Sequence, residues 1–478
     1  MPDSIQLDIN LEKKSGNAFK TALENGRFTV LIECSVPSEE IDPASSAERL
    51  AALENAVLKH SGVNTGLAFT DFDTRNRRWR AAEFATRLPE NNRDRHVVYI
   101  SGSNTAKNQA SLLAAMAANA GIPNIVPVSG TLPLNVSGAR DCRKVTFTES
   151  TAMLRAFSCS SEVFCGCTVN PFQYMEYPLL GQYFKMVKKI NCGAGFIVTQ
   201  AGWDMLKIQS IAWFMMNRKL FYPMLARLII LTPEKVEEIV AGKHPGIRIS
   251  QDFRRILERE LHYSKNQFEA AQYRRIELQA AGCRLMGFSG IQISGAENPL
   301  KAQLVLSRIE QALKEYTDFN IWLEEYNAYM ASAEMAPFSN NFQLYDPILT
   351  RDYPMDTGVI SNDIGIPECS GIESILLKVK EMMFSCAAEQ RSGHLAVAKT
   401  LLAGCRKCSS CRLPLREYVC PEQCPKRLAD GPCGGVKPDG SCELSKSECV
   451  HSKIVRFAHK RGTLPELETK NVDQAEKI

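Results

Sequence analysis

The stretch FTVLIECSVP, residues 28–37, decides how the first three hundred residues fold. It is a run of apolar and β-branched residues with one charged side chain, Glu33, and a proline ends it. Such continuous apolar character is typical of a strand in a parallel sheet that helices cover. Glu33 therefore lies on a strand that we expect to be buried, where an ionisable group suggests a functional role.

Seven further runs of this kind follow, and segments with helical spacing separate them. The predicted strands are residues 62–72, 96–103, 124–130, 163–172, 193–200, 226–233 and 283–294. Eight strand–helix units predict an α/β fold, a (β/α)8 TIM barrel over residues 20–330, with long helices at 252–282 and 298–330. A doubly wound open sheet is the alternative, which the absence of G-x-G-x-x-G after the first strand and of a P-loop disfavours.

Composition narrows the class of protein. The 478 residues exceed one ordinary core, so a second, smaller domain is expected. Lys plus Arg is 57 and Asp plus Glu is 53, and the net charge of +4 does not indicate nucleic-acid binding. The sequence shows no secretory signal and no apolar run long enough for a membrane span, so we expect a cytoplasmic protein with reduced thiols.

In a barrel of this kind the chemistry lies at the C-terminal ends of the strands. The polar residues at these predicted ends are Glu33, Thr70, Asp71, Ser101, Ser129, Thr131, Asn170, Thr199 and Gln200. Apart from Glu33, each of them taken singly is also explained as a strand cap or a solvated loop residue.

Eight cysteines lie within 45 residues near the C-terminal end, and we predict that they bind metal. They are Cys405, Cys408, Cys411, Cys420, Cys424, Cys433, Cys442 and Cys449. The first three form a ferredoxin-like C-x2-C-x2-C run, and eight thiolates suffice for two [4Fe–4S] clusters. Two structural zinc sites with four cysteine ligands each are the alternative, and His451 could replace one thiolate in either case. The other nine cysteines, such as Cys34 and Cys159, are expected to be small buried hydrophobes.

Four segments of the barrel resemble methylenetetrahydrofolate reductases: LIECSVP (31–37), NIVPVSGTLP (124–133), NPF (170–172) and KKINCGAGFIVTQ (188–200). The resemblance spans about residues 25–330. The segment CPKRLADGPCGGVKPDGSCEL (424–444) resembles the cysteine-rich C-terminal domain that accompanies these reductases in anaerobic bacteria.

The resemblance implies a flavin, FAD or FMN, across the strand ends and a folate stacked against it. Glu33 corresponds to the acid that protonates the pterin, and Gln200 to the amide that binds it. Thr131 is also expected at the substrate. Lys189 corresponds to a flavin-phosphate contact, and further flavin contacts are expected from Thr70, Ser101, Ser129 and Asn170.

Three positions depart from the pattern of the family. Thr131 replaces an Asp, Tyr99 replaces a His, and Gln182 replaces an acidic residue. The missing charge at Thr131 is expected to raise the reduction potential of the flavin, because the anionic reduced form is repelled less.

The predicted organisation is a barrel over 20–330, a linker over 331–368, a cysteine-rich domain with its own core over 369–460, and a polar tail over 461–478. The resemblance implies an oxidoreductase that interconverts 5,10-methylenetetrahydrofolate and 5-methyltetrahydrofolate, with electrons relayed through the cysteine-rich domain. A ferredoxin-like carrier, another partner protein or NADH would be the donor, and an oligomer or complex is expected. The alternative is a non-redox folate- or methyl-carrier-binding barrel with a zinc-stabilised docking module.

Overall fold

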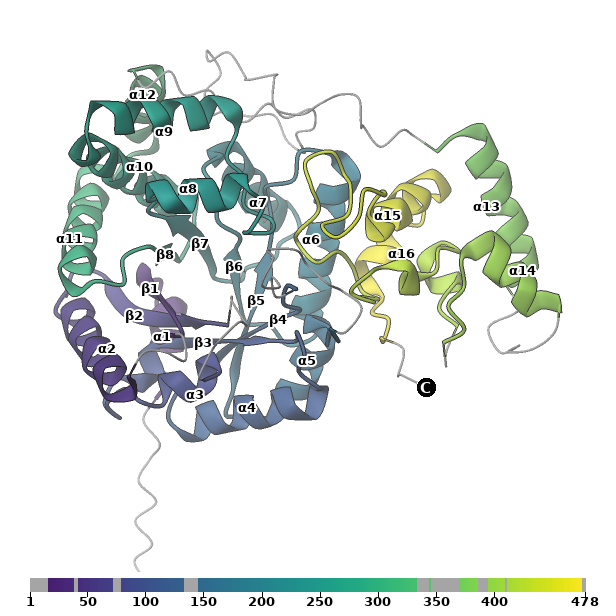
Figure 1. Cartoon of the computed structure of the whole chain (residues 1–478), viewed down its shortest axis with the longest axis horizontal. Helices are drawn as coiled ribbons and strands as arrows, with labels where there is room; N and C mark the ends of the chain where they lie inside the picture. The colour runs from purple at the N-terminus through teal and green to yellow at the C-terminus, as the bar shows by residue number, and fades with distance from the viewer. Residues whose placement is uncertain are drawn as a thin grey trace, which may run out of the picture.

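Eight parallel strands close into a barrel in which each strand pairs with the next in the sequence and β8 pairs with β1 (Figure 1). This computed structural model describes residues 16–37, 42–71, 79–132, 145–332, 344, 369–385, 394–408 and 411–474. The strands are β1 (Thr29–Ser35), β2 (Asn64–Thr70), β3 (Val97–Ser101), β4 (Asn124–Val128), β5 (Phe164–Val169), β6 (Phe196–Thr199), β7 (Met224–Ile229) and β8 (Gly290–Ser294). The predicted (β/α)8 barrel is confirmed.

Helices surround the barrel, and α1 packs against its interior cluster. They are α1 (Ala18–Glu24), α2 (Pro43–Leu58), α3 (Ala81–Ala85), α4 (Lys107–Asn119), α5 (Ser150–Phe157), α6 (Glu176–Asn191), α7 (Met205–Asn217), α8 (Pro233–Val240), α9 (Gln251–Tyr263), α10 (Lys265–Leu285), α11 (Pro299–Glu315) and α12 (Phe319–Ser332). No helix in the described part of the chain combines the length and the apolar character that crossing a membrane requires.

The two long helical segments predicted at 252–282 and 298–330 are each two helices. Ser264 has an extended backbone, and its hydroxyl accepts the amide of Gln267, so it ends α9 and begins α10. Asp318 begins α12 in the same way, because its carboxylate accepts the amides of Asn320 and Ile321.

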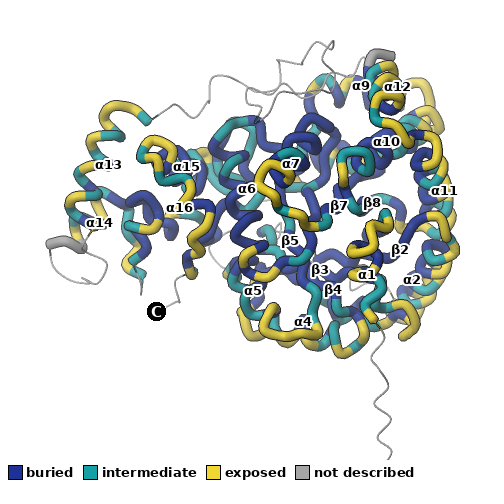
Figure 2. Tube along the Cα trace, turned by 180° about the vertical axis from the view of Figure 1, so that it is seen from behind, coloured by how far each residue is buried: buried dark blue, intermediate teal, exposed yellow. Residues whose placement is uncertain are grey.

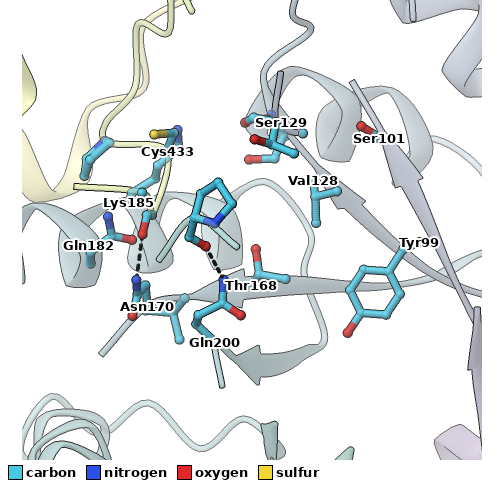
Figure 3. A pocket seen from close by; sticks show the side chains of 18 of the residues that line it. Tyr99, Ser101, Val128, Ser129, Thr168, Asn170, Gln182, Lys185, Gln200 and Cys433 are labelled. Carbon is cyan, nitrogen blue, oxygen red and sulfur yellow. Dashed lines mark hydrogen bonds between the residues drawn. The ribbon is translucent and has the colours of Figure 1, made fainter. Parts of the chain in front are cut away.

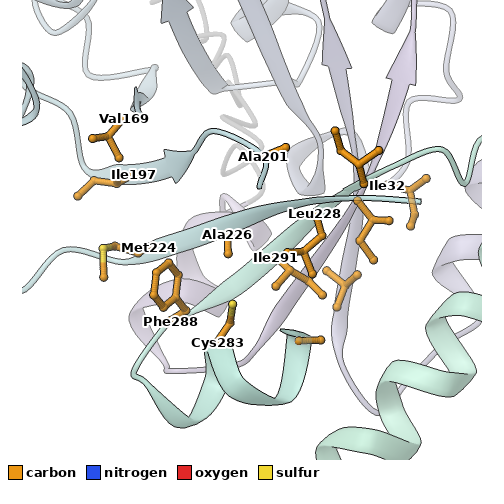
Figure 4. Close-up of a cluster of buried hydrophobic side chains, with 14 of the residues drawn as sticks. Ile32, Val169, Ile197, Ala201, Met224, Ala226, Leu228, Cys283, Phe288 and Ile291 are labelled. Carbon is orange, nitrogen blue, oxygen red and sulfur yellow. The ribbon is translucent and has the colours of Figure 1, made fainter. Parts of the chain in front are cut away.

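Alternation along the strands separates two apolar layers. One set of side chains, including Val30, Ile32 and Leu228, packs between the sheet and the helices (Figure 4). The other set, including Leu31 and Leu225, fills the barrel interior. Residues two positions beyond these interior residues point to the same side, toward the barrel mouth. This parity places Glu33 of β1 and Arg227 of β7 at the mouth.

The C-terminal part consists of α13 (Gly371–Phe384), α14 (His394–Ala403), α15 (Val450–Arg461) and α16 (Leu464–Thr469), with a cysteine-rich loop region between α14 and α15. It lies beside α6, and α13 and α14 lie farthest from the barrel (Figure 1). Its apolar cluster includes Tyr177 and Phe184, which belong to α6 of the barrel. Among the described residues, the barrel clusters contain no residue of the C-terminal part, but α6 contributes to the cluster of that part, so the two parts pack against each other.

Three further expectations differ from the structure or lie outside it. The segment after residue 460, predicted as a polar tail, forms α16, and its Leu467 and Val472 are buried. Cys159 is exposed, whereas Cys34 is buried as predicted. The predicted linker lies almost entirely outside the described residues. Figure 2 shows that α6, which lies between the barrel strands and the C-terminal helices, is largely buried.

Candidate active site

A cavity of about 1060 Å³, open to solvent, lies at the C-terminal ends of the strands. Seven of the eight barrel residues predicted for the site line it (Figure 3): Thr70, Ser101, Ser129, Thr131, Asn170, Lys189 and Gln200. They come from strand ends and loops that are far apart in the sequence, with Lys189 from α6. The structure therefore brings together the residues that the family resemblance selected, except for Glu33.

Several hydrogen-bonding groups in this cavity have no partner among the described residues. They are the hydroxyls of Thr70 and Ser150 and the side-chain amide nitrogen of Gln182, and all three are buried. Buried polar atoms are rarely left unsatisfied in folded proteins. Their position beside the cavity would let a polar ligand complete their hydrogen bonds.

Glu33 lies behind the cavity wall. Its carboxylate accepts two hydrogen bonds from Arg227, Nη2 at 2.6 Å and Nε at 2.7 Å, and a third at 2.9 Å from Gln292 Nε2. Arg227 also donates from Nη1 to Gln200 Oε1 at 2.9 Å, and Tyr99 donates to Gln292 Oε1 at 2.7 Å. A continuous buried network thus joins Glu33 to residues that line the cavity.

This network favours the charged form of Arg227. Burial lowers the pKa of Arg227, but the attraction of the Glu33 carboxylate raises it by more. The pKa of Arg227 therefore lies above its ordinary value. A bidentate guanidinium–carboxylate pair is a strong, directional contact. Arg227 therefore engages both carboxylate oxygens of Glu33 in this structure.

Two lysines of α6, Lys185 and Lys189, line the cavity. Lys189 Nζ donates to the carbonyl of Thr168 at 2.6 Å, and burial lowers the pKa of Lys189 to about 8. Lys185 Nζ donates to the Glu149 carboxylate and to the Gly431 carbonyl, at 2.9 and 2.8 Å. Lys189, for which a contact to a flavin phosphate is predicted, lines the cavity, whereas Lys185 is paired with Glu149.

The cysteine-rich part forms one wall of the same cavity. Residues 432–435, with Lys426 and Glu443, line it opposite the strand ends. Asn170 Nδ2 donates to the Gly434 carbonyl at 2.6 Å, and Thr131 Oγ1 donates to Glu443 Oε1 at 3.1 Å. Figure 3 shows Cys433 facing the cavity beside Gln182. The site is therefore composite and belongs to both parts of the chain.

The eight clustered cysteines fall into groups. Cys424, Cys433, Cys442 and Cys449 line one small cavity together with His451. Cys420 lies near Cys405 and Cys408, whose charges add to the effect of burial in raising its pKa. Cys411 packs against the apolar cluster of the domain. None of the described cysteines forms a disulfide bond.

Most of these sulfurs accept a hydrogen bond from a backbone amide in the same local geometry. The amide two residues further on donates to the sulfur of Cys405, from Lys407 at 3.4 Å, and of Cys442, from Leu444 at 3.5 Å. The same i+2 contact is present at Cys420, Cys424, Cys433 and Cys449. Amide donors of this kind stabilise metal-bound thiolates, so the local backbone fits a metal site.

The thiols do not form a finished coordination shell. No group of three or more His, Cys, Asp or Glu side chains in the described ranges is arranged to hold a metal ion. Metal binding by the eight cysteines accordingly stays a prediction.

Sequence reasoning missed Arg227, Gln292, Lys426 and Glu443 as site residues. Arg227 was overlooked because the seventh strand was predicted at 226–233, which put Arg227 at its start, whereas β7 ends at Ile229. The alternation of Leu225 and Arg227 within a buried run was the available signal. Nothing local indicated Lys426 or Glu443, because they reach the cavity from another domain.

The fold and the site together define a (β/α)8-barrel protein whose mouth is closed on one side by a cysteine-rich domain. Residues 385–477 match the family described as methylene-tetrahydrofolate reductase C terminal. The chain thus carries the C-terminal domain of that family on a TIM barrel, as the sequence resemblance indicated.

No curated protein matches the chain. Among solved structures, a Pseudomonas aeruginosa protein described as a dihydrodipicolinate synthetase aligns with 67% of this chain and 94% of its own, at 11% identity and a TM-score of 0.31. A likeness this weak says nothing about activity.

Proposed function

We propose that the chain is a flavin-dependent oxidoreductase that interconverts 5,10-methylenetetrahydrofolate and 5-methyltetrahydrofolate. The observation that carries the proposal is the composite cavity. Apart from Glu33, the residues that the resemblance assigns to flavin and folate line one cavity, and one wall of it belongs to the domain that matches the reductase family. A barrel of this architecture carries its chemistry at that face.

The cavity contains the groups that a flavin requires. A bound flavin would supply hydride exchange with the one-carbon unit of the folate. Thr70, Ser150 and Gln182 offer unsatisfied buried hydrogen-bonding groups, and Lys189 offers a cation for a phosphate. The wall at residues 432–435 limits the access of water from the side of the second domain.

Reduction of the methylene compound consumes two electrons and two protons, so one group must deliver a proton to the pterin. Glu33 is the predicted acid, but Arg227 donates hydrogen bonds to both of its carboxylate oxygens. The acid role therefore requires Arg227 to separate from Glu33 when substrate binds. Gln200 already accepts a hydrogen bond from Arg227, and its amide can pair with a pterin edge.

We assign electron delivery to the cysteine-rich domain. Cys433 lines both the barrel cavity and the small cysteine cavity, so the two sites share a wall. Two iron–sulfur clusters held by the eight thiols would accept electrons from a ferredoxin-like carrier, another partner protein or NADH. The i+2 amide–sulfur contacts support thiolate ligation, and they suit zinc as well.

The second candidate is a non-redox barrel that binds a folate or a methyl carrier and uses zinc to stabilise the cysteine-rich domain. The bidentate Glu33–Arg227 pair favours it, because it leaves no free acid at the mouth. In this case the cysteines would be structural.

One preparation separates the two candidates. The protein is purified anaerobically, its visible spectrum is recorded, and its iron and zinc are measured. Flavin bands, a broad brown shoulder and viologen-coupled oxidation of 5-methyltetrahydrofolate are expected. Zinc without iron, in a protein with no visible absorbance, would establish the alternative.

A further inference from the structure

Glu443 places a carboxylate next to Thr131, the position at which the related reductases have an Asp. The resemblance places an Asp at the end of β4, and this chain has Thr131 there. The Thr131 hydroxyl donates to Glu443 Oε1 at 3.1 Å, so a carboxylate occupies the neighbourhood of that position. The carboxylate comes from the other domain, 312 residues further along the chain.

The carboxylate of Glu443 is held firmly. Its Oε2 accepts a hydrogen bond from Lys426 Nζ at 2.8 Å and lies 3.3 Å from the sulfur of Cys433. Lys426 also donates to the carbonyl of Gly130, next to Thr131, at 3.1 Å. Both partners of the ion pair are nearly inaccessible, with side chains 3% and 5% exposed. A buried pair in this setting fixes the position of both charges.

The other carboxylates near the mouth of the barrel are bound by other partners. Asp71 also lines the cavity, but Arg80 and the amide of Ala81 bind it and connect the end of β2 to the start of α3. Glu33 is paired with Arg227 behind the wall. Glu149 is paired with Lys185 below it. Glu443 is therefore the carboxylate that the cysteine-rich domain contributes to the cavity wall.

We propose that Glu443 is a ligand-contact residue of the barrel cavity which the cysteine-rich domain supplies, and that it sets the relative affinity of the cavity for oxidised and anionic reduced flavin. The inference rests on the proposed flavin site. Removal of the carboxylate leaves the buried Lys426 ammonium unneutralised, which adds one positive charge to the wall. A positive charge stabilises the anionic reduced flavin more than the neutral oxidised form.

The test measures the dissociation constants of FMN and FAD for wild type and for Glu443→Gln. Each flavin is measured both in its oxidised form and after reduction by dithionite. We expect the ratio of affinities to move toward the reduced form by roughly tenfold, the effect of one charge at about 10 Å in a medium of intermediate dielectric. Glu417→Gln is the matched control, because Glu417 is a buried carboxylate of the same domain that binds Arg461 and Thr463 away from the cavity.

A second control separates Glu443 from its neighbour in the sequence. Cys442→Ser changes the adjacent thiol and retains the carboxylate, and iron and zinc are measured in every variant. An equal shift in Cys442→Ser would assign the effect to the cysteine site and overturn the proposal. An unchanged ratio in Glu443→Gln, or an equal shift in Glu417→Gln, would overturn it as well.

If the wild-type protein binds neither flavin, the proposed function fails, and the contact itself is tested without ligand. Hydrogen exchange of the amides in 129–132 is compared between wild type, Glu443→Gln and Thr131→Val. Faster exchange in both variants supports a wall that Glu443 organises across the domains. Exchange unchanged from wild type refutes the proposal.

Discussion

Glu149 joins the two parts of the chain, and its replacement should loosen them. This barrel residue lies immediately before α5 and is 1% exposed. Its carboxylate accepts Lys185 Nζ at 2.9 Å and the backbone amides of Ala429 and Asp430 at 2.8 and 3.0 Å. One barrel carboxylate therefore satisfies two amides of the cysteine-rich domain and a buried lysine.

The magnitude follows from what Glu149→Ala leaves behind. An uncompensated buried ammonium at Lys185 costs about 3–5 kcal/mol. Each orphaned amide costs about 1–3 kcal/mol. These contributions share one carboxylate and do not add fully, so a loss of about 5 kcal/mol is expected. Glu149→Gln retains a carbonyl acceptor and should cost about 2 kcal/mol.

Hydrogen exchange measured by mass spectrometry is the assay, because it reports local opening in a chain whose unfolding is not a single transition. Protection of residues 428–432 should fall strongly in Glu149→Ala and partly in Glu149→Gln. Glu237→Ala is the control, since Glu237 forms an exposed pair with Arg254 and its loss should change stability by about 0.5 kcal/mol or less. If Glu149→Ala loses no more protection than this control, the two domains do not depend on each other through this carboxylate.

Three other predictions follow from the same contacts. Glu33→Gln should leave flavin bound and reducible but slow its reoxidation by methylenetetrahydrofolate at least about 100-fold, measured by stopped flow; a near wild-type rate would remove Glu33 from the acid role. Cys408→Ser should lose about one cluster's worth of iron by elemental analysis and keep the flavin; zinc without iron in the wild type would contradict the relay. Burial, and then the nearby Arg416, lowers the pKa of Lys188 to about 7. Between about pH 7 and pH 10 only the unfolded chain holds this proton, so the free energy of unfolding should rise with pH across this window. Lys188→Met should flatten this part of the stability–pH curve.

The barrel could be predicted from the sequence because its signal is local and repeated. Each strand is a short apolar run, and each lies between helical segments, so an error of a few residues at one strand does not change the fold. The same error matters at the site. The predicted seventh strand began two residues late, and this hid Arg227, whose side chain pairs with the one acidic residue that the sequence did single out.

The shared wall of the cavity could not be predicted because the sequence segments that form it have the composition of solvent-exposed surface. The segment KMVKK of α6, residues 185–189, has the composition of a solvated helical face, yet all three of its lysines are buried. Their partners are Glu149, two backbone carbonyls of residues 430 and 431, and the carbonyl of Thr168. Lys185 and Lys188 are bound by a domain some 240 residues further on, which no local pattern reports.

The position of the cysteine-rich domain changes what its removal would mean. If the domain did not contact the barrel, deletion of residues 369–478 would leave a complete flavin barrel that lacks only its electron supply. In this structure the deletion also removes Cys433, Gly434 and Glu443 from the cavity wall and exposes Tyr177 and Phe184 of α6. Loss of flavin in the truncated chain would then show that the wall is part of the site. A truncated barrel that binds flavin as tightly as the full chain would show that the strand ends suffice alone and that the domain acts only as a carrier.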